Sequence, residues 1–232
     1  MERENGINQA VTRDTAWANG MALYYEAVGE GRPVVLLHGN GEDHTLFAAQ
    51  VRQLTAAGYR VYTPDSRGHG MNPPLEEYHY ADMAEDVYQL ITAWGLSRPA
   101  LYGHSDGGII GLLLALAHPD ALSLLAVSGT NLSPAGLKPD FLVSCAGDNS
   151  PLTRLMLTEP HIAPTSLRRI KLPVLVTAGS DDLILPEETR RLAACLPRAE
   201  LHILEGHDHG SYIHNSEIMG RLLLDFFQKH GY

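Results

Sequence analysis

The sequence predicts an α/β fold, with a mostly parallel central sheet that has an antiparallel start and carries helices on both faces. Short apolar runs typical of buried strands alternate with segments of helical periodicity along most of the chain. This alternation indicates parallel strands, because each helix returns the chain to the same end of the sheet. The antiparallel start is indicated by Asn19-Gly20, which lies between two β-suited stretches and provides the positive φ angles of a tight hairpin.

The individual elements follow from their apolar runs and from the residues that end them. After the hairpin, strands are expected at residues 33–37, 60–63, 99–102, 122–127, 172–177 and 200–204. Helices are expected at residues 46–57, 81–94, 109–117, 187–196 and 218–227. Gly58 and Gly95 follow the first two helices, where glycine readily adopts the left-handed conformation that ends many helices. The third helix is apolar on all sides and is therefore expected to be buried.

The composition is that of one compact domain. With 232 residues, 44% hydrophobic and 19% charged, the chain is similar to ordinary globular domains, and we expect residues 1–232 to form a single one. Several prolines and polar residues break the strand–helix rhythm at about residues 130–166, which predicts a small cap insertion. The apolar side chains of this cap either line a pocket or pack the cap itself: Leu132, Leu137, Phe141, Leu155, Met156 and Leu157.

Charge and composition also restrict the partners of the protein. The formal net charge of −10 includes no basic run, so nucleic acid and anionic membranes would be repelled, and a small-molecule partner is expected. The polar start lacks the apolar core of a signal peptide, and no segment reaches the ~18 apolar residues of a membrane span. We therefore expect a cytoplasmic protein. Cys145 and Cys195 have the spacing of neither a disulfide framework nor a metal clamp and are expected to be reduced.

The segment with the most specific chemistry is Gly-x-Ser-x-Gly at residues 103–107. It lies between a predicted strand and the apolar helix, which is the context of a nucleophile elbow. The elbow turns so sharply that a Cβ two residues either side of the serine would collide with the neighbouring strand and helix. A glycine-rich turn with an ordinary serine is the alternative, but the strand–helix context favours Ser105 as a nucleophile.

A serine hydroxyl is a poor nucleophile at neutral pH, so a base and a group that orients the base are required. Asp181 and Asp182 follow the strand at 172–177, and His207 and His209 follow the last strand. One of the two carboxylates is expected to be the acid, and one of the two histidines is expected to be the base. The residues alone do not decide between Asp181 and Asp182 as the acid, or between His207 and His209 as the base.

With these motifs, the chain resembles the α/β-hydrolase family from residue 31 to residue 227. The family's Gly-x-x-Asp spacing, counted from Gly179, implies Asp182 as the acid, and Asp181 then suits a cap for the following helix. An ungapped match of the last strand and its loop implies His209 as the base. His207 remains an alternative, because its Gly-His pair also fits the family pattern.

The resemblance also implies the donors of an oxyanion hole, which stabilises the negative charge of the transition state. They are the backbone N–H groups of Asn40, in a His-Gly-x-Gly turn, and of Asp106, at the start of the buried helix. The Asp106 carboxylate must point away from the developing anion. His38 is expected to order its loop by hydrogen bonds, and the Asp-x-Arg-Gly-x-Gly segment at residues 65–70 is expected to be structural.

A metal site is the alternative function of the polar residues around the last strand: His202, His207, Asp208, His209 and His214. Alternation along a strand would turn some of these side chains to opposite faces, and the helical His-Glu-x-x-His arrangement is missing. We therefore expect neither a metal nor an organic cofactor.

The expected function is hydrolysis of small-molecule carboxylic esters through an acyl-enzyme intermediate. Ser105 disfavours dehalogenases and epoxide hydrolases, which have an aspartate in its place. Thioesterase and lactonase activities remain close alternatives on the same three side chains. An alternative of a different class is a sensor that binds a small signal with little turnover.

Overall fold

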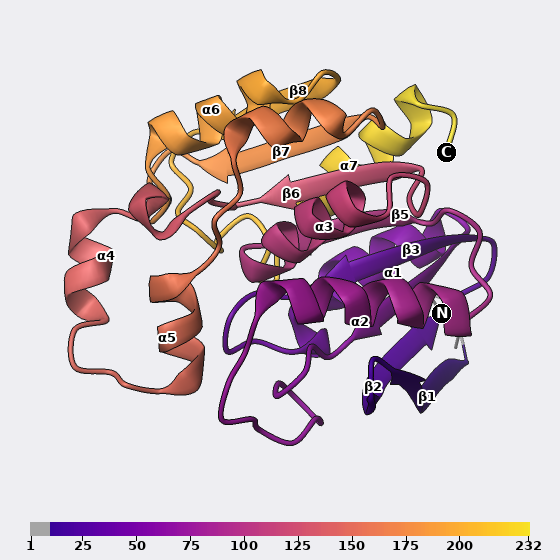
Figure 1. The fold of residues 1–232 in the computed structure, drawn as a ribbon. Helices are drawn as coiled ribbons and strands as arrows, with labels where there is room; N and C mark the ends of the chain where they lie inside the picture. Colours follow the sequence, from indigo (N-terminus) through magenta and orange to yellow (C-terminus); the bar gives the residue numbers. More distant parts are fainter. Residues whose placement is uncertain (1–9) are drawn as a thin grey trace, which may run out of the picture.

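The computed structural model describes residues 10–232 and contains one eight-stranded sheet of order β1-β2-β4-β3-β5-β6-β7-β8 (Figure 1). β1 (Val11–Ala18) and β2 (Met21–Val28) form the predicted hairpin, with positive φ angles of 45° at Asn19 and 81° at Gly20. β2 is also antiparallel to β4 (Tyr59–Pro64). The antiparallel start is therefore confirmed.

All other strand pairs are parallel. The remaining strands are β3 (Arg32–Leu37), β5 (Ala100–His104), β6 (Leu124–Ser128), β7 (Val174–Gly179) and β8 (Ala199–Leu204). Every residue of β5, β6 and β7 is buried, as expected for central strands that are covered on both faces. Since parallel strands end at the same edge, the loops after β3, β5, β7 and β8 meet at one edge of the sheet.

The helices form a layer on each face of the sheet, so the predicted fold class is confirmed (Figure 1). One apolar cluster joins the sheet to α2 (Tyr80–Ala93), α3 (Asp106–Ala117) and α6 (Pro186–Cys195). A second cluster joins it to α1 (Ala48–Ala56) and α7 (Ile218–Lys229). Among the helices of residues 10–232, none combines the length and apolarity needed to cross a membrane.

The boundaries of several elements differ from the sequence prediction. α3 begins at Asp106, three residues before the predicted start at residue 109, because the elbow glycines already adopt helical geometry without adding to the apolar pattern. β6 and β7 each begin two residues later than predicted. A short 3₁₀ turn, His44–Phe47, precedes α1. Cys145 and Cys195 are both free.

The segment between β6 and β7 contains α4 (Pro139–Ser144) and α5 (Pro151–Thr158), which stand beside the carboxyl ends of these strands (Figure 1). Short 3₁₀ turns, Pro134–Gly136 and Pro164–Arg169, connect them to the sheet. The apolar residues of this segment divide into two groups. Leu132 and Leu155 are buried in the core, whereas Leu137, Phe141 and Met156 line a cavity at the edge of the sheet.

Candidate active site

Ser105 lies at the sharp turn between β5 and α3. Its φ of 52° and ψ of −114° are unusual for a residue with a side chain, and its amide donates to the Ser128 carbonyl at 2.7 Å. A Cβ on Gly103 would overlap the backbone of Gly107, and a Cβ on Gly107 would overlap the Leu37 carbonyl. The turn thus has the geometry predicted for the nucleophile elbow.

His209 and Asp182 come from the loops after β8 and β7 and are directly paired. The Nδ1 atom of His209 lies 2.7 Å from Oδ1 of Asp182, whose side chain is 2% exposed. Gly179 allows the two loops to meet, because a Cβ there would overlap the carbonyls of His207 and Asp208. The backbone of the Asp182 loop is joined to the histidine loop, since the Asp181 amide donates to the His207 carbonyl at 2.9 Å.

The other candidate histidine lies elsewhere. Nδ1 of His207 is 3.1 Å from the Ser211 hydroxyl, and its ring packs against Tyr212. The Asp208 carboxylate accepts hydrogen bonds from the amides of Gly210 and Ser211, which close the turn around His209 and lower the pKa of Asp208. Of the two histidines, only His209 therefore contacts a carboxylate among the described residues.

The expectation that Asp181 caps the following helix is wrong. α6 begins at Pro186, its N-cap residue is Leu185, and no side chain makes a capping hydrogen bond. A proline in the first turn has a preset φ and lacks one N–H group, which reduces the need for a side-chain cap. The acceptor role belongs to Asp182 instead, whose Oδ1 accepts from the Ile184 amide at 2.9 Å.

A cavity of about 260 Å³ lies where the loops meet. Ser105 and His209 both line it, as do the two predicted oxyanion-hole residues, Asn40 and Asp106. Its apolar side is formed by the segment between β6 and β7 and by the residues after Asp182: Leu137, Phe141, Met156, Leu183 and Ile184. The structure therefore brings four of the five predicted site residues together around one cavity, and the fifth, Asp182, contacts His209 from outside the cavity lining.

The Asp106 carboxylate is held by two neighbouring side chains. Tyr80 donates its hydroxyl to Oδ1 at 2.8 Å, and the Asn40 side-chain amide donates to Oδ2 at 3.0 Å. Burial raises the pKa of Asp106, and burial next to Asp106 raises that of Tyr80 well above its ordinary value. These bonds fix the carboxylate in the cavity wall, and its backbone amide is the first N–H of α3, which has no partner within the helix.

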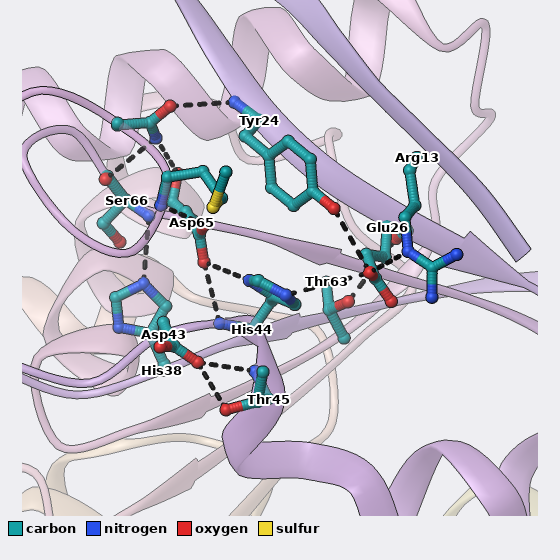
Figure 2. A network of polar contacts seen from close by, with 12 residues as sticks. Arg13, Tyr24, Glu26, His38, Asp43, His44, Thr45, Thr63, Asp65 and Ser66 are labelled. Carbon is teal, nitrogen blue, oxygen red and sulfur yellow. Dashed lines mark hydrogen bonds and ion pairs between the residues drawn. The ribbon is translucent and has the colours of Figure 1, made fainter.

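His38 orders the loop that contains Asn40, as predicted. Its Nδ1 donates to the Gly39 carbonyl at 2.8 Å, and its Nε2 accepts from the Ser66 amide at 3.0 Å (Figure 2). This pattern requires the neutral ring, and burial lowers the pKa of His38 to about 4. His38 thus joins the loop after β3 to the loop after β4.

The Asp-x-Arg-Gly-x-Gly segment is structural, as predicted. Fully buried Asp65 accepts hydrogen bonds from the His44 amide and from Nδ1 of the same residue, both at 2.8 Å (Figure 2). Arg67 makes a two-pronged contact with Asp86 of α2, at 2.7 and 2.6 Å. The segment therefore connects the loop after β3 to α2.

Sequence patterns did not identify four residues of the site. Tyr80 and Glu42 line the cavity from a helix start and a loop that have no motif of their own. His104 precedes the nucleophile and is buried, a position that the elbow motif leaves variable. Gly129 lies under the acid–histidine pair, since a Cβ there would be 2.6 Å from Cε1 of His209 and 3.3 Å from Oδ2 of Asp182.

Comparisons with known proteins bear on the family and the fold of this chain. The family profile described as alpha/beta hydrolase fold matches residues 32–159. The "Putative carbamate hydrolase RutD" of Caulobacter segnis is 31% identical over 258 residues, covering 89% of this chain and 96% of that protein. "Serine hydrolase BPHL" of Mus musculus is 26% identical over 254 residues, covering 94% of this chain and 87% of that protein.

Solved structures share the fold at lower identity. A meta-cleavage product hydrolase from Pseudomonas fluorescens has a TM-score of 0.80 at 19% identity, covering 93% of this chain and 97% of that chain. The enol-lactonase from Burkholderia xenovorans has a TM-score of 0.77 at 23% identity, covering 92% and 99%. The profile match extends over more than half of the residues. This chain belongs to the alpha/beta hydrolase fold family.

Proposed function

We propose that the protein hydrolyses carboxylic esters of small molecules through an acyl-enzyme intermediate on Ser105. The observation that carries the proposal is the hydrogen-bonded Asp182–His209 pair, whose histidine lines the same cavity as a serine on a nucleophile elbow. A serine, a histidine and a carboxylate in this relation form the arrangement that activates a hydroxyl for acyl transfer.

In the proposed cycle, Ser105 Oγ attacks the acyl carbon while Nε2 of His209 accepts its proton. Asp182 holds the proton on Nδ1 of His209, which keeps Nε2 available as the base, and stabilises the imidazolium that forms. His209 then protonates the leaving alcohol, and a water molecule activated by the same histidine hydrolyses the ester bond to Ser105. The cycle requires neither a metal nor an organic cofactor.

The negative charge on the former carbonyl oxygen requires preorganised donors. We assign this role to the backbone N–H groups of Asn40 and Asp106. No acceptor within residues 10–232 is recorded for the Asn40 amide, and the start of α3 adds the favourable end of the helix dipole. The bonds from Tyr80 and Asn40 to the Asp106 carboxylate keep its charge engaged with donors of its own.

Carbamate hydrolysis is a second candidate, favoured by relatives at 28–31% identity that are named as carbamate hydrolases. The same serine would form a carbamoyl-enzyme, and the side-chain amides of Asn40 and Asn131 give the cavity polar groups beside its apolar wall. Thioesters and lactones require the same steps at the carbonyl carbon. These substrates differ in the leaving group and in the group transferred to Ser105, and the cavity would select among them by the fit of these two groups.

A substrate panel tests the proposal. We expect repeated turnover of p-nitrophenyl acyl esters, with a preference that falls as the acyl chain outgrows the cavity of about 260 Å³. A matched p-nitrophenyl carbamate, a thioester, a lactone and an anilide are assayed beside them. A faster rate on the carbamate would support the second candidate. A single burst without further turnover would support a sensor, and no reaction with any substrate would refute the proposal.

Asp182→Asn is expected to lower kcat by about 10⁴-fold. The amide oxygen of Asn can still accept from the Ile184 amide, so the loop should hold, but it cannot stabilise the imidazolium. The matched control is Asp181→Asn, because Asp181 is exposed and contacts the neighbouring loop through its backbone. Kinetics and thermal melting of both variants give the comparison, and a larger loss at Asp181 would reverse the assignment.

Gly129→Ala is expected to lower kcat by about 10²-fold, since a displacement of about 1 Å at a reacting group has this effect. The new methyl group would lie 2.7 Å from Nδ1 of His209 and push the ring from Asp182. Gly206→Ala is the control, because Gly206 also has a positive φ, 73° against 56°, but has open space around it. If both variants lost the same activity, backbone strain would explain the effect and the contact with His209 would not.

A further inference from the structure

A second group of polar side chains lies beside the proposed catalytic residues and has no role in the cycle. Glu42 comes from the loop after β3, His104 is the last residue of β5, and His214 follows β8. One ligand atom of each lies within 4.8 Å of the others. We call this group the Glu42 cluster. Of the five polar residues around the last strand, His202, His207, Asp208, His209 and His214, only His214 belongs to it.

The separations within the Glu42 cluster suit a small tetrahedral cation. Nε2 of His214 lies 3.0 Å from Oε1 of Glu42, and Nε2 of His104 lies 4.0 Å from Oε2 of the same carboxylate. Ligands at about 2.0–2.2 Å from zinc, at the tetrahedral angle, are about 3.3 Å apart. The two measured distances involve different oxygens of Glu42, and one ligand atom of each residue lies within 4.8 Å of the others, so the side chains must move closer together to close around an ion.

Two of the three side chains are already oriented. His104 is 2% exposed, and its Nδ1 is 3.2 Å from the Ser128 hydroxyl, which leaves Nε2 as the ring nitrogen on the Glu42 side. Burial lowers the pKa of His104 well below its ordinary value, so its ring is neutral, the form that binds metals. Glu42 accepts from the Gly39 amide at 2.8 Å. Such outer hydrogen bonds orient metal ligands.

The third side chain provides access. The His214 side chain is 51% exposed, and it lines open surface pockets together with Glu42 on one side and His209 on the other. Glu42 and His104 line the inner cavity. An ion can therefore reach the Glu42 cluster from solvent, and three protein ligands leave its fourth position open to water.

We propose that Glu42, His104 and His214 form a binding site for zinc or a similar divalent transition metal ion, and that the bound ion inhibits the enzyme. Two imidazoles and one carboxylate are ligands that zinc prefers, whereas calcium and magnesium take oxygen ligands. The ion is a regulatory ligand and takes no part in the hydrolytic cycle.

Inhibition follows from the position of the site. The rings of His104 and His209 are 4.8 Å apart between centroids. The Glu42 carboxylate, the Ser105 Cβ and the His104 ring all lie within 3.4 Å of the position that a Cβ on Gly39 would occupy. A divalent charge here opposes formation of the His209 imidazolium and crowds the hydroxyl of Ser105. This consequence rests on the proposed function, whereas metal binding itself does not.

Binding is measured first, without any substrate. Protein treated with a chelator and desalted is titrated with Zn²⁺ by calorimetry, and with Co²⁺ by its visible absorption, which reports the coordination geometry. We expect one equivalent to bind. His214→Ala should weaken this binding by more than about 100-fold, because losing an outer-shell partner alone costs 10–100-fold. His202→Ala, an exposed histidine on β8 outside the cluster, should bind as the parent does.

A third variant separates the metal site from the proposed active site. His209→Ala should retain zinc binding, because His209 does not belong to the Glu42 cluster. Ester turnover of the parent and of His202→Ala should fall at least tenfold in saturating Zn²⁺ and return with chelator, whereas His214→Ala should be insensitive. Unchanged binding by His214→Ala, or loss of binding in His209→Ala, would overturn the proposal whether or not the protein is an esterase.

Discussion

Ser105→Ala is expected to reduce ester turnover by about 10⁶-fold, the loss that removal of a serine nucleophile causes when an acyl-enzyme is obligatory. The methyl group fits the elbow, because Ser105 keeps its turn through a backbone bond to Ser128 and through Gly103 and Gly107. The fold should therefore survive, and the loss should be chemical. A thermal melting curve tests whether the fold survives, and kcat tests whether the chemical step is lost.

Covalent labelling gives an independent readout of the same variant. A fluorophosphonate should add one equivalent to the parent protein by intact mass and none to Ser105→Ala. Ser180→Ala is the matched control, because Ser180 follows β7 and its hydroxyl accepts from the Gly206 amide away from the cavity. Labelling of Ser105→Ala to the level of the parent would show that another side chain is the nucleophile.

His209→Ala is expected to have an effect of the same order, about 10⁶-fold in kcat, because the serine and its base act as one unit. Without an imidazole, the Ser105 proton has no acceptor, and the leaving alcohol has no donor. The Asp182 carboxylate also loses the His209 ring nitrogen at 2.7 Å and stays buried, so the melting temperature should fall as well. Rate and melting temperature together describe the variant.

His207→Ala is the control for this experiment. His207 follows the same strand two residues earlier, but its ring contacts Ser211 and Tyr212. Its removal should leave turnover within a few-fold of the parent. Near-normal turnover in a folded His209→Ala protein, with a large loss in His207→Ala, would transfer the role of base to His207.

Element order was predictable from the sequence, because it depends on short-range periodicity. The eight strands and the helices α1, α2, α3, α6 and α7 follow apolar runs whose length and spacing differ clearly between strands and helices. The helices α4 and α5 lie in the predicted cap and were not predicted as helices. The boundaries were less accurate where polar and glycine residues take part in a helix. Asp106 to Gly108 are helical because the elbow positions them over the sheet, a constraint that no local pattern contains.

For the acid and the base of the candidate site, the residues alone predicted a pair of candidates each, and they did not decide between the members of a pair. Spacing motifs identified the serine, two adjacent carboxylates and two nearby histidines. The choice of Asp182 and His209 came from the family resemblance, and the contact between them is a tertiary one, 27 residues apart in the chain. Glu42, His104 and Gly129 were not identified, since each depends on what another loop brings beside it.

The sequence by itself thus determined the α/β architecture, the elbow at Ser105 and a short set of candidates, because backbone propensity and apolar periodicity are local properties of the chain. Only the tertiary structure decided that Asp182 faces His209, that Asp181 does not cap α6, and that Glu42 lies beside His104 and His214. These contacts join loops from the ends of four strands. Their geometry depends on how the parallel sheet aligns those ends and on the close approaches that its glycines allow.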